Sequence, residues 1–126
     1  MEEKLTNIFA NDPSVKLAYL FGSQATGKTG PLSDYDIAIY LDEKNSKKVF
    51  DKKLEIREQV SRLLGTDRVD IVALDTVKEP EFAYNVIAFG KLVFEREPYK
   101  VLLEPKILNE YFDFRDAMRK FNLTKS

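Results

Sequence analysis

The pair Gly30-Pro31 most constrains how this chain can fold, because little helix can follow it. It comes directly after residues 22–29, GSQATGKT, which match the nucleotide-binding P-loop pattern G-x-x-x-x-G-K-[ST]. A P-loop needs a helix at this point, since the amides of the helix N-terminus hold the phosphates. Proline costs about 3 kcal/mol inside a helix, and glycine costs about 1 kcal/mol relative to alanine. The sequence therefore argues against a P-loop, in which Asp75, at the end of an apolar predicted strand, would supply the metal-binding carboxylate.

A different pattern begins at the same glycine, and the strands that this pattern requires are predicted on both sides of it. The apolar run over residues 15–21 predicts a buried strand that leads directly into Gly22, and Asp34 and Asp36 open a second predicted strand. Because side chains alternate along a strand, we expect both carboxylates on one face. Two such charges repel unless a cation joins them, and Mg²⁺ is commonly held by one or two carboxylates together with substrate phosphates.

A third acidic residue, Asp70, interrupts an otherwise apolar predicted strand. A buried, unpaired carboxylate is expensive, so the sequence predicts a partner for it. If this strand lies beside the strand of Asp34 and Asp36, three carboxylates surround two metal ions, an arrangement used for in-line phosphoryl transfer. Taken alone, Asp70 is also consistent with an edge-strand residue that forms an ion pair with Arg68 or Lys91.

The composition limits which catalytic groups and which partners the chain can have. The chain has no cysteine and no histidine, which excludes thiol nucleophiles, imidazole bases and Ser-His-Asp triads. Its 20 basic and 21 acidic residues create no overall basic field, so nucleic acid is not an expected partner. No apolar run approaches the roughly 20 residues of a membrane helix, and the N-terminus does not resemble a signal peptide, so we expect a cytoplasmic protein.

The chain is predicted to form a single α+β domain over residues 1–126, with elements in the order α-β-turn-β-α-β-α-β-α. Ser46 is the predicted cap of the first long helix. The last helix carries an apolar stripe that either packs on its own sheet or docks a partner protein or a second copy of the chain. The stripe consists of Ile107, Tyr111, Phe114, Met118 and Phe121, widened by Leu108 and Phe112. The predicted helices are residues 2–10, 49–64, 79–89 and about 104–121, and the predicted strands are residues 15–21, 36–41, 68–74 and 91–95.

Gly22-Ser23, the aspartates Asp34 and Asp36, and the later Asp70 together resemble the DNA polymerase β-like nucleotidyltransferases. The similarity covers roughly residues 15–94 and is strongest to the minimal nucleotidyltransferase (MNT) antitoxins that accompany HEPN toxins. It implies a palm-like nucleotidyltransferase fold with a mixed β-sheet flanked by helices. It also implies Mg²⁺-dependent transfer of a nucleoside monophosphate, AMP from ATP in the nearest relatives, to a hydroxyl with release of pyrophosphate.

The resemblance assigns a role to each residue of the motif. Asp34 and Asp36 would bind both of two Mg²⁺ ions, and Asp70 would bind the catalytic ion and help deprotonate the acceptor. Ser23 and the backbone of Gly22 would hold the triphosphate of the NTP.

The chain departs from the family pattern at one position. Many relatives carry arginine where this chain has Thr26, so Lys28 is the candidate phosphate contact in its place. The resemblance implies a tyrosine of a HEPN toxin as the acceptor. Two alternatives stay open: an antitoxin that binds its partner without catalysis, and an aminoglycoside-like nucleotidyltransferase that modifies small molecules, completed by a homodimer.

Overall fold

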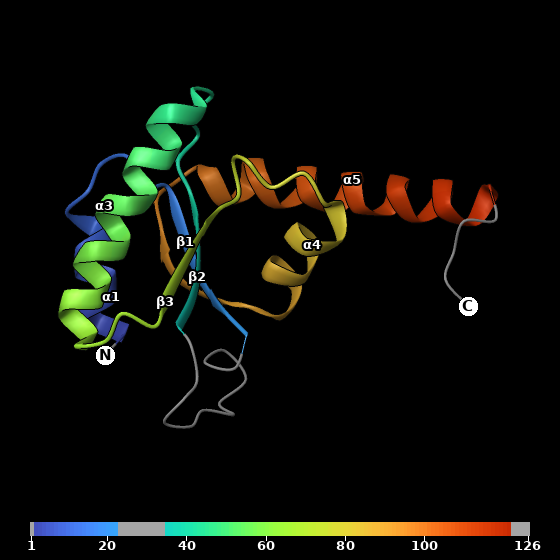
Figure 1. Ribbon diagram of the computed structural model, residues 1–126. Helices are drawn as coiled ribbons and strands as arrows, with labels where there is room; N and C mark the ends of the chain where they lie inside the picture. The colour runs from blue at the N-terminus through green and yellow to red at the C-terminus, as the bar shows by residue number, and fades with distance from the viewer. Residues whose placement is uncertain (1, 23–34, 122–126) are drawn as a thin grey trace.

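Four strands form one mixed sheet in the part of the chain that the computed structural model describes, residues 2–22 and 35–121 (Figure 1). Helices cover both faces of this sheet, which confirms the α+β class and the predicted order of elements. The strands are β1 (Leu17–Phe21), β2 (Tyr35–Tyr40), β3 (Val69–Ala73) and β4 (Lys91–Glu95), and the helices are α1 (Glu2–Ala10), α3 (Ser46–Leu64), α4 (Pro80–Phe89) and α5 (Tyr99–Lys120).

The strand order β3-β2-β1-β4 determines which residues meet at each end of the sheet. β1 runs antiparallel to both β2 and β4, whereas β2 and β3 are parallel. The last residue of β1, Phe21, therefore lies opposite Asp36, and Asp36 lies beside Asp70. The start of β4 at Lys91 reaches the same end, since Lys91 pairs with Leu20.

The core consists of two apolar layers, one on each face of the sheet. Alternate residues of β1 enter different layers: Ala18 and Leu20 face α1 and α3, while Leu17 and Tyr19 face α4 and α5. Burial on both faces explains why β1 is apolar throughout its buried length. Figure 1 shows α1 and α3 together on one side of the sheet and α4 and α5 on the other.

The cap of α3 is Asn45 rather than the predicted Ser46. The Asn45 side chain accepts hydrogen bonds from the backbone N–H groups of Lys47 and Lys48, at 3.0 and 3.1 Å. Asparagine and serine have similar N-cap preference, so composition alone cannot distinguish neighbouring candidates. As predicted, the helix ends at Gly65, which takes the left-handed conformation with φ of +67°.

Helix α5 begins at Tyr99, five residues before the predicted Glu104, and it includes Pro105 in its interior. The extra turns are held by tertiary contacts: Leu103 is buried, and the Tyr19 hydroxyl donates a hydrogen bond to the Glu104 carboxylate at 2.7 Å. Burial and this carboxylate together raise the pKa of Tyr19. Proline removes the hydrogen bond to the carbonyl of Val101, but Val101 is exposed and water can replace that bond.

None of the described helices combines the length and the apolar character needed to cross a membrane.

Asp75 follows β3 and connects it to the segment after β2. Its carboxylate accepts hydrogen bonds from the backbone N–H of Leu41 at 2.9 Å and from that of Glu43 at 3.0 Å. Burial raises the pKa of the Asp75 carboxyl, and the backbone amides of Glu43 and Leu41 partly offset the rise. Asp75 therefore has a structural role at the end of the sheet opposite Asp36 and Asp70.

Replacing Asp75 with alanine should lower the free energy of unfolding by about 1–3 kcal/mol, because two partly buried amides lose their acceptor. Urea denaturation followed by circular dichroism would measure the change. Asp67→Ala is a suitable control, since Asp67 is exposed in the loop before β3. Equal stability of the two variants would contradict the structural role of Asp75.

Candidate active site

Asp36 and Asp70 occupy adjacent positions on the parallel strands β2 and β3. Neighbouring strands lie about 4.8 Å apart, and residues paired in register project from the same face. The strand of Asp70 therefore lies beside the strand of Asp36, which is the arrangement that a shared metal site requires. Asp36 shares its face with Ala38, which packs in the layer formed by α4 and α5.

Asp70 is exposed, although it interrupts an otherwise apolar strand. β3 is an edge strand, and only its alternate residues Val69, Ile71 and Ala73 enter the core. The face that carries Asp70 is open at this position. The proposed alternative partner Lys91 lies on β4 at the opposite edge of the sheet, where it forms an ion pair with Glu2 at 2.8 Å.

Gly22 is in close contact with Asp36. Its backbone has φ of +72°, a conformation that favours glycine, and a Cβ at this position would lie 2.5 Å from Oδ2 of Asp36. The glycine therefore serves two purposes: it ends β1 with a turn, and it leaves space for the Asp36 carboxylate at the strand end. The sequence identified Gly22 as a phosphate-binding turn, and its contact with Asp36 is additional.

Three of the predicted site residues lie outside the described part of the chain: Ser23, Lys28 and Asp34. Their roles stay predictions. Among residues 2–22 and 35–121, no cluster of three or more His, Cys, Asp or Glu side chains is placed to hold a metal ion. The described site accordingly offers the two carboxylates of Asp36 and Asp70.

A pocket of about 610 Å³ opens beside Gly22. One wall is the end of β1, where Phe21 contacts Phe82 of α4 in an edge-to-face arrangement with ring centres 5.7 Å apart. The other wall is the face of α4 that carries Phe82, Asn85 and Phe89. The sequence reasoning missed this pocket, although the spacing of seven residues between the two phenylalanines indicates a shared helix face.

The comparisons with known proteins agree with this architecture. A model of the family described as polymerase beta, nucleotidyltransferase matches residues 3–99. The chain belongs to the polymerase β nucleotidyltransferase family. The match includes Gly22, Asp36 and Asp70, and thus the whole described site of this nucleotidyltransferase. It ends at residue 99, where α5 begins.

Solved structures share the fold over nearly the whole nucleotidyltransferase chain. A chain of a toxin–antitoxin complex with AMP-PNP is 23% identical, with a TM-score of 0.77 and coverage of 95% of this chain and 94% of that chain. A chain of the complex between a tri-AMPylated HEPN toxin and an MNT antitoxin from Shewanella oneidensis is 21% identical, with a TM-score of 0.68 and coverage of 96% and 95%. No protein with a curated description matches this nucleotidyltransferase by sequence.

Gly22→Ala and Gly65→Ala test the contact between Gly22 and Asp36. Both positions have a positive φ, so each alanine should cost about 1–2 kcal/mol of stability. A Cβ at Gly65 meets no atom within 4 Å, whereas a Cβ at Gly22 would displace the Asp36 carboxylate. If that carboxylate holds a cation, Gly22→Ala should weaken Mn²⁺ binding, measured by calorimetry, by about 10-fold or more, as for a displaced metal-site group. Equal Mn²⁺ affinity in the two variants would show that the contact does not matter for the site.

Proposed function

We propose that this nucleotidyltransferase is an Mg²⁺-dependent adenylyltransferase that transfers AMP from ATP to a hydroxyl of a partner protein. The observation that carries the proposal is the in-register pairing of Asp36 with Asp70 at the end of the sheet where β1 turns at Gly22. Family membership supports nucleotidyl transfer. The choice of adenine nucleotide is supported by two proteins of similar fold, one described with AMP-PNP and one with an AMPylated toxin.

The described donors fit Mg²⁺. Both side chains supply oxygen, the ligand type that Mg²⁺ prefers, and Asp70 is exposed and thus leaves room for water and phosphate ligands. We propose that Asp36 and Asp70 hold the ions together with Asp34, and that Ser23, Lys28 and the Gly22 backbone bind the triphosphate. Bound Mg²⁺ would neutralise the charge that develops on the phosphate oxygens.

Asp70 is the general base of the proposed transfer. The Asp70 carboxylate accepts the proton of the acceptor hydroxyl, and the resulting oxygen attacks the α-phosphorus of ATP. A bond forms between the acceptor oxygen and this phosphorus, while the bond from the phosphorus to the oxygen bridging the α- and β-phosphates breaks. Pyrophosphate leaves with the bonding electron pair, and AMP remains attached to the acceptor.

For the acceptor we propose a tyrosine of a HEPN toxin, so that AMP transfer makes this chain an antitoxin. Support comes from the AMPylated HEPN toxin in the Shewanella oneidensis complex. It also comes from α5, whose C-terminal half extends away from the rest of the described chain (Figure 1). In this half Phe112 is 46% exposed, although Tyr111 stacks on Tyr84 of α4 with ring centres 3.9 Å apart. The apolar stripe of α5 is thus divided between the protein's own core and a surface available to a partner.

The activity is tested by incubating the purified chain with a HEPN protein, Mg²⁺ and α-labelled ATP. Asp70→Asn should reduce labelling of the partner by roughly 10²–10⁴-fold, the range expected for loss of a general base. Asp36→Asn should abolish labelling, because the two carboxylates no longer act together. Asp67→Asn, an exposed change near the same sheet end, should label at the wild-type rate.

Circular dichroism should show that Asp36→Asn and Asp70→Asn remain folded. Full activity of folded Asp36→Asn would defeat the proposed mechanism. If these variants lose labelling but still neutralise the toxin in cells, the chain is a binding antitoxin and catalysis is not its function. Labelling of an aminoglycoside in place of protein would favour the small-molecule alternative.

The partner surface is tested by a pair of surface variants. Phe112→Asp should weaken the complex with the HEPN protein by roughly 10-fold or more, as expected when an exposed aromatic anchor is lost from an interface. Phe50→Asp is the matched control, because Phe50 is 55% exposed but lies on α3, across the sheet from α5. Surface plasmon resonance would measure both affinities, and an equal effect of the two changes would place the interface elsewhere.

A further inference from the structure

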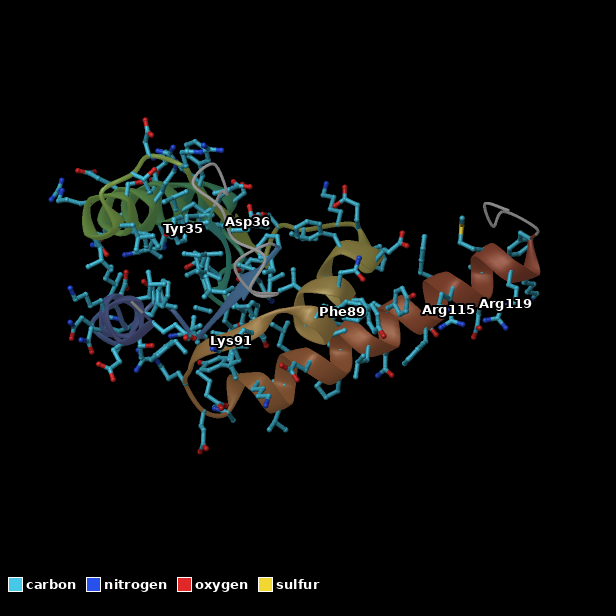
Figure 2. All side chains as sticks on the ribbon, turned by 90° about the horizontal axis from the view of Figure 1, so that it is seen from below. Tyr35, Asp36, Phe89, Lys91, Arg115 and Arg119 are labelled. Carbon is cyan, nitrogen blue, oxygen red and sulfur yellow. The ribbon has the colours of Figure 1, made fainter. Side chains whose placement is uncertain are left out.

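The pocket between β1 and α4 is continuous with the catalytic end of the sheet. Gly22 lines the pocket and is also the residue that contacts the Asp36 carboxylate. Figure 2 views the molecule from this end and shows Asp36 on β2 and Phe89 at the end of α4. A molecule held by Asp36 through a metal ion can therefore extend past Gly22 into this pocket.

The position of α4 against β1 depends on a second glycine. A Cβ on Gly90 would lie 2.3 Å from the carbonyl oxygen of Val86 and 2.9 Å from that of Leu20. Only glycine allows the end of α4 to approach β1 this closely. The close approach at Gly90 thus fixes the distance between the two walls of the pocket, β1 and α4.

The lining of the pocket suits a flat, uncharged group. Its described lining residues include no acidic or basic side chain. Phe89 is 70% exposed and Phe82 is 36% exposed, and both project from one face of α4 about two turns apart. Asn85 lies between them and offers a donor and an acceptor from one amide. Bases stack on aromatic side chains, and an asparagine amide pairs with the donor–acceptor edge of adenine.

We infer that this pocket binds the nucleobase of the NTP, with Phe89 and Phe82 as stacking surfaces and Asn85 as the group that selects adenine. The inference rests on the nucleotidyl transfer proposed above. The strand order separates the two substrates, because Asp70 lies on one side of Asp36 and the pocket beside β1 lies on the other. The acceptor approaches Asp70, and the base occupies the opposite side. The volume of about 610 Å³ is within the range of small-molecule sites.

The experiment measures equilibrium binding of ATP, GTP and inorganic tripolyphosphate to the full chain in the presence of Mg²⁺. Phe89→Ala should weaken ATP binding by roughly 5- to 100-fold, which corresponds to the loss of one base stack. Asn85→Ala should reduce the preference for ATP over GTP by a similar factor. Tripolyphosphate has no base, so its affinity should be the same in the wild type and in both variants.

Two matched variants serve as controls. Phe50→Ala removes a phenylalanine that is also more than half exposed, on α3, and Asn109→Ala removes an exposed asparagine from α5, so neither should change ATP binding. Thermal melting should show that Phe89→Ala is folded, as its exposure implies.

The outcomes separate this inference from the proposed function. If the wild type binds neither ATP nor tripolyphosphate, the proposed function itself fails. If the wild type binds ATP and both pocket variants bind it unchanged, the base lies elsewhere and only the pocket assignment is overturned. Unchanged ATP affinity with reduced labelling of the HEPN protein would instead assign the pocket to the acceptor.

Discussion

The antiparallel pairing of β1 with β2 is the constraint on which the rest of this structure depends. Because β1 ends where β2 begins, the turn residue Gly22 and the carboxylate of Asp36 must lie at the same end of the sheet. The absence of a side chain at Gly22 then allows the carboxylate to approach the end of β1. The parallel pairing of β2 with β3 adds Asp70 to the same end. Two backbone pairings thus assemble groups from three strands without a separate binding loop among the described residues.

The two faces and the two ends of the sheet differ in the chemical groups that they carry. The face covered by α1 and α3 is apolar core, and the end near Asp75 is closed by hydrogen bonds from the backbone of Leu41 and Glu43. The opposite end combines the half-buried Asp36 and the exposed Asp70 with a pocket whose described lining is uncharged. This separation suits a nucleotide, because the metal-bound phosphates need carboxylates nearby whereas the base needs aromatic surface.

Much of the fold and part of the site could be predicted from the sequence, because these depend on local patterns. Strand alternation and glycine turns gave the order of elements and identified Asp36 and Asp70. The exposure of Asp70 could not be fixed in advance, because a single sequence does not decide whether β3 is central or at the sheet edge. The start of α5 was missed for a related reason: burial of Leu103 and the bond from Tyr19 to Glu104 outweigh the local effect of Pro105. Tertiary contacts of this kind produce no periodic pattern in the amino-acid sequence.

The pocket beside Gly22 illustrates a further limit of sequence patterns. Phenylalanines at seven-residue spacing are typical of a helix face that packs in a core, and Val86 of α4 is indeed buried. Phe82, in the first turn of α4, and Phe89, its last residue, are instead 36% and 70% exposed and line the pocket beside the close approach of Gly90 to Leu20. One helix therefore buries Val86 in the core and places Phe82 and Phe89 at an open pocket. Close backbone approach at two glycines, Gly22 and Gly90, rather than any charged motif, thus determines where the pocket that we propose for the nucleobase lies.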